Sequence, residues 1–156
     1  MTTLNRTVRI VYPFPTSFLD YADTENLAVL VYFMGCDNNC DECHNVQFKD
    51  FNYKQNTLEM NLTDLIDKLN LSCMKNYTTK VVLTGGDPLA NKNLSFTKAL
   101  LGDTCNNFDF MIYTGTDVEW SKSKEIVGFE FLKCGKYISL KSHKSEKTDE
   151  YIKFAS

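Results

Sequence analysis

Four apolar segments recur along this chain, and glycine lies at or just after the end of each. They cover residues 27–34, 80–84, 108–113 and 129–133 and are rich in β-branched and aromatic residues. The first of them, residues 27–34, is a continuous apolar run, which is typical of a strand buried on both faces of a sheet, and the other three are predicted to be strands as well. The segments between them are long enough for helices, and strands alternating with helices predict a mainly parallel sheet with right-handed crossovers.

The intervening segments carry helix signals of their own. Apolar side chains between residues 60 and 71 recur at helical spacing, and Asn61 or Thr63 can cap that helix. Asp117 can cap a later one in the same way. The expected further elements are a strand at 8–12 and helices from 88 or 92 to 101 and from 117 to 127.

The number of these units limits how far the sheet can close. Four long strands and three helices are too few for a closed barrel of eight units. We therefore expect an α/β fold, an open partial (β/α) barrel, that forms a single domain over residues 1–156. Ligands of parallel α/β sheets bind at the carboxyl ends of the strands. The four strand ends with glycine thus predict a ligand site along one edge of the sheet.

The composition and net charge argue against a nucleic-acid-binding protein and against a membrane protein. The chain is 43% hydrophobic and 24% charged, and its net charge of −3 provides no general attraction to nucleic acid. No segment approaches the ~18 apolar residues of a membrane span, and the N-terminus lacks the apolar stretch of a signal peptide. We expect a cytoplasmic protein that binds neither nucleic acid nor membrane. In a reducing compartment its six cysteines are better interpreted as metal ligands, catalytic thiols or buried side chains than as disulfides.

Three of the six cysteines lie within eight residues. Cys36, Cys40 and Cys43 follow the first long apolar segment, with Asp, Asn and Glu between them. Those intervening residues favour a turn over an apolar helix face. Thiolates this close repel one another unless a cation holds them, so the spacing predicts a metal site. Two metal centres fit: a zinc ion with His44 or another fourth ligand, or an iron–sulfur cluster with one iron left open.

The Cys-x3-Cys-x2-Cys pattern resembles the signature of radical S-adenosylmethionine (SAM) enzymes. Residues 84–89, Thr-Gly-Gly-Asp-Pro-Leu, resemble the glycine-rich SAM motif of the same family. The resemblance implies a [4Fe–4S] cluster on Cys36, Cys40 and Cys43, with SAM bound at the open iron. It also implies SAM contacts, mostly through backbone groups, from these residues of the two motifs: Glu42, Cys43, His44, Gly85, Gly86 and Asp87.

Further motifs resemble those of one particular group of radical SAM enzymes. Over residues 27–137 the chain is similar to the activating proteins of anaerobic ribonucleoside-triphosphate reductases, through Tyr113-Thr-Gly115, Glu119 and Gly135-Lys-Tyr137. Cys134 departs from that family, whose members tend to carry Asp before the late glycine. The resemblance implies a radical SAM oxidoreductase that generates a glycyl radical on the large reductase subunit and receives its electron from a donor protein.

Other interpretations stay open from the sequence. The chain can be the activase of another glycyl-radical enzyme, a radical SAM enzyme acting on a small molecule, or a zinc-stabilised binding module without catalysis. Cys73 and Cys105 fall in other elements and are expected to be non-catalytic. Cys134 ends the last long strand and is therefore expected on the predicted ligand edge.

Overall fold

The computed structural model describes residues 6–22, 27–36, 46–135 and 150–152 of the chain. No helix within these ranges is long and apolar enough to cross a membrane. The elements are, in chain order, β1 (Thr7–Val11), β2 (Thr16–Ser17), β3 (Ala28–Phe33), the short 3-10 helix η2 (Val46–Lys49), β4 (Thr57–Asn61), α1 (Leu62–Lys75), β5 (Lys80–Gly85), α2 (Asn91–Thr104), β6 (Asp109–Tyr113), α3 (Val118–Ser123), β7 (Phe131–Cys134) and β8 (Glu150–Ile152).

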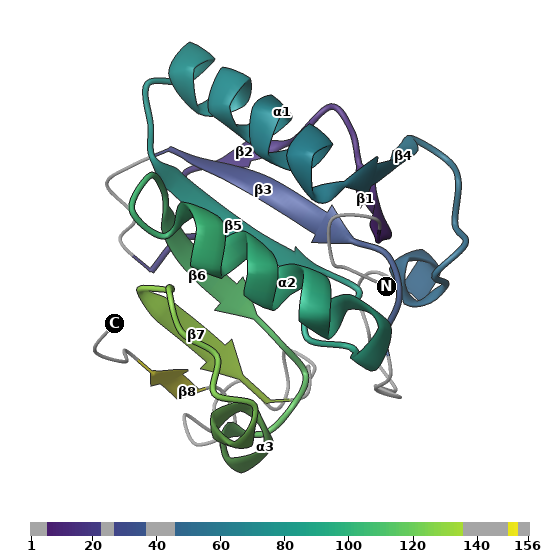
Figure 1. Ribbon diagram of the computed structural model, residues 1–156, viewed down its shortest axis with the longest axis vertical. Helices are drawn as coiled ribbons and strands as arrows, with labels where there is room; N and C mark the ends of the chain where they lie inside the picture. Colours follow the sequence, from purple (N-terminus) through teal and green to yellow (C-terminus); the bar gives the residue numbers. More distant parts are fainter. Residues whose placement is uncertain (1–5, 23–26, 37–45, 136–149, 153–156) are drawn as a thin grey trace.

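Eight strands of the described residues form one sheet with a parallel centre. The order is β4-β1-β3-β5-β6-β7-β8, with β2 paired to β3 outside this path. Strands β3, β5, β6 and β7 pair in parallel, and their arrowheads point the same way in Figure 1. The flanking strands pair antiparallel. The order is linear, with β4 and β8 at its two ends, so the predicted α/β fold with an open, mainly parallel sheet is confirmed.

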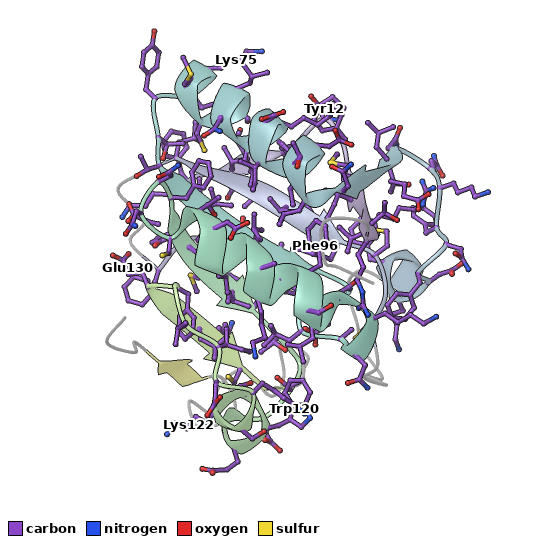
Figure 2. The ribbon with its side chains drawn as sticks, viewed as in Figure 1. Tyr12, Lys75, Phe96, Trp120, Lys122 and Glu130 are labelled. Atoms are coloured by element: carbon purple, nitrogen blue, oxygen red, sulfur yellow. The ribbon has the colours of Figure 1, made fainter. Side chains whose placement is uncertain are left out.

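Helices α1 and α2 cover one face of the sheet (Figure 1). Leu62, Leu65 and Leu69 of α1 recur at helical spacing, and all three are buried. Phe96, labelled on α2 in Figure 2, packs edge-on against Phe33 of β3 with ring centroids 6.4 Å apart. Each fully buried side chain of this size contributes about 1.5–3 kcal/mol, so this layer supplies most of the core.

The opposite face of the sheet buries a smaller group of side chains. Leu30, Val82 and Met111 lie in one row across the central strands, and Tyr21 packs over them. The Tyr21 hydroxyl donates a hydrogen bond to Glu130 at 2.7 Å. The segment before β3 therefore closes this face near the amino ends of the strands.

The structure corrects two helix boundaries expected from the sequence and adds three short strands. The first helix begins at Leu62 rather than at residue 60, because residues 57–61 form β4 and pair with β1. The third helix begins after its Asp117 cap as predicted but ends at Ser123, and Glu125 takes a φ of 54° that no helix residue adopts. The short strands β2, β4 and β8 were not expected, since their pairing depends on residues distant in the chain.

The cap of α1 leads to a first prediction. The Asn61 side chain accepts a hydrogen bond from the Asp64 backbone N–H at 2.8 Å. Asn61→Ala removes this acceptor and is expected to lower the free energy of unfolding by about 1 kcal/mol. Asn70→Ala, at an exposed position inside the same helix, is the matched control; it is expected to raise stability by about 0.5 kcal/mol because alanine favours helix. Urea denaturation of both variants measures the difference, and equal losses would contradict the capping role.

Candidate metal and SAM site

The carboxyl ends of the four parallel strands lie along one edge of the sheet, as the sequence predicted (Figure 1). The chain leaves β3, β5 and β7 through Gly35, Gly85 and Gly135, which have φ values of 99°, 110° and 113°. These left-handed conformations favour glycine, since a side chain would be strained there. We call this line of strand exits the carboxyl edge.

The cysteine segment begins at the first of these exits. Cys36 is half-buried, and its backbone N–H donates to the Lys49 carbonyl at 3.2 Å. The preceding Gly35 N–H donates to the Phe48 carbonyl at 2.6 Å. The chain between Cys36 and η2 thus leaves and rejoins the described structure at one place. Four expected site residues of this segment lie outside the described residues: Cys40, Glu42, Cys43 and His44.

The glycine-rich loop after β5 is bonded directly to this exit. Gly86 N–H donates to the Phe33 carbonyl, and Asp87 N–H donates to the Gly35 carbonyl, both at 2.7 Å. A Cβ on Gly86 would collide with the backbone of Gly35 and with the carbonyl oxygen of Phe48. The close approach that Gly86 permits is therefore one between two backbone segments of this chain, beside Cys36. Contacts of Gly85, Gly86 and Asp87 with SAM stay predictions.

The Asp87 side chain reaches along the carboxyl edge to the exit of β6. It is fully buried. One carboxylate oxygen accepts from the Leu89 N–H at 2.8 Å, and the other accepts from the Gly115 N–H at 3.0 Å. The Thr114 hydroxyl lies 2.8 and 3.0 Å from the two oxygens. The sequence identified Asp87 as a site residue but did not identify Thr114 as its hydrogen-bond partner. The one indication was the position of this threonine at the end of a buried strand.

Two of the three cysteines outside the cluster segment lie far from the carboxyl edge, and the third is buried at it. Cys73 lies near the end of α1, before β5 begins, and Cys105 follows α2, so both belong to the opposite end of the sheet. Burial raises the pKa of the Cys73 thiol to about 11, which keeps it protonated and a poor ligand at neutral pH. Cys134 does lie on the carboxyl edge, but it is buried, with its sulfur 3.7 Å from the Ser121 hydroxyl.

Within the described part of the chain, no three Cys, His, Asp or Glu side chains gather as a metal site. A metal centre at the carboxyl edge would therefore need ligands from outside the described residues, where the sequence predicts Cys40 and Cys43 as partners of Cys36. Such a set supplies three thiolates, the ligand type that iron–sulfur clusters take. The half-buried Cys36 at the edge of the sheet is compatible with this set, because its thiol is not enclosed in the core.

A row of half-buried side chains crosses the sheet face opposite α1 and α2. Tyr32 of β3 pairs with Thr84 of β5, and Tyr113 of β6 pairs with Lys133 of β7. Burial, and after it the negative charge of Asp20, raises the pKa of Tyr32 above its usual value. Its phenol therefore stays neutral well above physiological pH. Sequence reasoning did not identify Tyr32 as a neighbour of Thr84 or Tyr113 as a neighbour of Lys133, because these pairs form only through the parallel register.

A cavity of about 400 Å³ opens beside β1 and the exit of β3. Arg9, Lys54 and Lys92 contribute positive charge to its lining, against the single carboxylate of Glu59. Arg9 and Glu59 form an ion pair at 3.8 Å. Among the described residues, no cysteine or histidine lines this cavity.

The sequence was compared with known proteins and structures. Residues 23–150 match the family described as a 4Fe-4S single cluster domain, a span that includes both motifs. Among solved structures the chain resembles QueE from Escherichia coli, with a TM-score of 0.47 and 16% sequence identity over 69% of this chain and 53% of that one. The chain therefore spans about half the length of that protein. No curated protein matches it.

The contact at Gly86 leads to a second prediction. Gly86→Ala places a methyl group against backbone atoms on two sides and is expected to lower the free energy of unfolding by about 1–3 kcal/mol. Gly102→Ala is the matched control, because Gly102 is exposed in the last turn of α2 and nothing lies within 4 Å of its added Cβ. It is expected to stabilise the protein by roughly 0.5–1 kcal/mol. Thermal unfolding distinguishes the two, and a neutral Gly86→Ala would contradict the close packing of the loops.

Proposed function

The chain belongs to the 4Fe-4S single cluster domain family, and we propose that it is a radical SAM enzyme that activates an anaerobic ribonucleoside-triphosphate reductase by generating a glycyl radical on it. The Cys-x3-Cys-x2-Cys pattern and the Thr-Gly-Gly-Asp motif support the radical SAM class. The motifs at Tyr113–Gly115 and Gly135–Tyr137 support the narrower activase assignment.

One observation carries this proposal: the cysteine segment and the glycine-rich loop leave neighbouring parallel strands and bond to each other. Asp87 N–H donates to Gly35 O, one residue from Cys36. An enzyme that binds SAM at an open iron needs its cluster segment and its SAM loop within one small site. The carboxyl edge supplies that proximity through backbone bonds, which do not depend on side-chain rotamers.

The residues of the two motifs have two proposed roles, which are to bind the cluster and to contact SAM. Cys36, Cys40 and Cys43 would hold a [4Fe–4S] cluster, while Glu42 to His44 and Gly85 to Asp87 would contact SAM. Held by these residues, a reduced cluster would supply the one electron needed for the reductive cleavage of SAM and so for hydrogen-atom abstraction from a glycine of the partner. The chain's own contribution is to position these groups and to limit water and oxygen around them.

The large reductase subunit is the proposed substrate, and a separate protein is the proposed electron donor. Tyr32, Thr84, Tyr113 and Lys133 lie half-buried on the sheet face next to the carboxyl edge. A segment of another protein that packs on this row would lie close to both loops. An activase for a different glycyl-radical enzyme uses the same arrangement, so only the partner distinguishes the two assignments.

A zinc-stabilised binding module is the alternative from a different class. The family match favours an iron–sulfur cluster over zinc. Colour separates them, because protein purified without oxygen is brown with an iron–sulfur cluster and colourless with zinc.

The cluster ligands lead to a third prediction. Cys36→Ala, Cys40→Ala and Cys43→Ala are each expected to lose the cluster, since two cysteines hold four irons poorly. Cys105→Ala and Cys73→Ala, the same substitution at the other end of the sheet, are the controls and are expected to keep it. Iron and sulfide are measured after anaerobic reconstitution. Loss of iron from Cys105→Ala as complete as that from Cys36→Ala would refute the three-ligand assignment.

The substrate leads to a fourth prediction. With a strong reductant and SAM, the protein alone is expected to cleave SAM slowly. Addition of the large reductase is expected to produce a glycyl radical on that partner, visible as a narrow doublet in electron paramagnetic resonance. The control is a reductase in which the radical-bearing glycine is replaced by alanine. Rapid turnover of a small molecule by this chain alone, without a radical on the reductase, would refute the activase assignment and leave the radical SAM class standing.

A further inference from the structure

The Asp87 carboxylate has no exposed surface, and protein groups occupy its oxygens. Its donors are the Leu89 and Gly115 backbone N–H groups and the Thr114 hydroxyl, all within 3.0 Å. The side chain thus lies between the loop after β5 and the exit of β6. A ligand that approached from outside the sheet would meet other atoms before this carboxylate.

Two further hydroxyl groups continue from Thr114 along the carboxyl edge. The Thr116 hydroxyl lies 2.9 Å from that of Thr114 and 2.8 Å from that of Ser121 on α3. A carboxylate only accepts hydrogen bonds, so the Thr114 proton is directed to Asp87. The Thr114 oxygen accepts in turn from the Thr116 backbone N–H at 3.2 Å, and the Ser121 hydroxyl donates to the Asp117 carbonyl at 2.9 Å. The buried charge therefore orients the Thr114 hydroxyl, and the hydroxyl groups of Thr116 and Ser121 lie next to it.

Backbone bonds link the same residues to the neighbouring strands. Thr114 N–H donates to the Lys133 carbonyl of β7, and Gly135 N–H donates to the Thr116 carbonyl, both at 2.9 Å. On the other side, the Asp87 N–H donates to the Gly35 carbonyl after β3. Asp87 thus connects the exit of β3 through its backbone with the exit of β6 through its side chain.

We propose that the Asp87 carboxylate and the Thr114 hydroxyl act as a pair of positioning residues, which hold the Gly85–Gly86 loop at the distance from Cys36 that SAM binding requires. The carboxylate does this without touching SAM. The inference rests on the proposed function for the identity of the ligand. It differs from a direct ionic contact between Asp87 and the SAM ammonium group, in which Thr114 would have no part.

The test compares single and double variants of the pair in anaerobically reconstituted, cluster-loaded full-length protein. Asp87→Asn and Thr114→Val are each expected to weaken SAM binding about tenfold, measured by calorimetry. The double variant is expected to bind only slightly more weakly than either single variant, because both substitutions break the same bond. Thr114→Ser keeps the hydroxyl and is therefore expected to bind SAM about as tightly as the unsubstituted protein.

Thr104→Val is the matched control. Thr104 is also buried, and its hydroxyl donates to the Leu100 carbonyl within α2, away from the carboxyl edge. It is expected to lose stability without a change in SAM affinity. Normal affinity in Thr114→Val together with weakened binding in Asp87→Asn would overturn the proposal in favour of direct contact. Additive losses in the double variant would also overturn it.

A second measurement needs no SAM and so separates this inference from the proposed function. Amide hydrogen exchange at Leu89 and Gly115 is expected to accelerate in both Asp87→Asn and Thr114→Val, and to stay unchanged in Thr104→Val. Unchanged exchange in Thr114→Val would overturn the positioning role. Accelerated exchange in a protein that binds no SAM would instead support the positioning pair and refute the radical SAM function.

Discussion

The loops that leave β3 and β5 meet backbone to backbone, and the contact leaves no space for a side chain at Gly86. Two hydrogen bonds of 2.7 Å, from Gly86 to Phe33 and from Asp87 to Gly35, join these loops. Hydrogen bonds between peptide groups are directional, so two of them fix both the distance and the angle between the segments. Cys36 follows Gly35 directly, and its position relative to the glycine-rich loop is therefore set by the backbone.

The same loop is held on its other side by a buried charge. A buried carboxylate is costly unless hydrogen bonds compensate for its lost hydration, and bonds to a charged group are stronger than bonds between neutral ones. Leu89, Thr114 and Gly115 provide this compensation for Asp87. Breaking any of these bonds would leave the buried charge partly uncompensated. The exits of β5 and β6 are therefore expected to keep their positions relative to each other. A site built this way is rigid where the chain leaves the sheet.

The sequence was most informative where the signal was local. The central strands are rich in apolar residues, and Asn61 and Asp117 cap the helices that follow them as predicted. The shared edge also followed from the alternation of strands and helices. The pairing of Asp87 with Thr114 did not, because these residues are 27 positions apart and become neighbours only through the parallel register of Leu83 with Ile112.

The short strands at the flanks show the same limit. Strand β4 has only two buried residues among its five, so its pattern is weak, and its pairing partner β1 lies about fifty residues earlier in the chain. The ligand roles of Cys40 and Cys43 remain sequence predictions, since both residues lie outside the described part of the chain. The structure places Cys36 at the carboxyl edge and shows no group of three potential metal ligands among the residues it describes.

Burial on the sheet face opposite the helices decreases toward the carboxyl edge. Leu30, Val82 and Met111 are buried beneath Tyr21, whereas Tyr32 and Tyr113, two residues further along their strands, are half-buried. The face is thus closed near the amino ends and accessible beside the two loops. Radical chemistry requires that water and oxygen be kept from the reacting groups. A macromolecule docked on this half-buried row would shield the reacting groups from both, and this is the cover that the proposed protein substrate would supply.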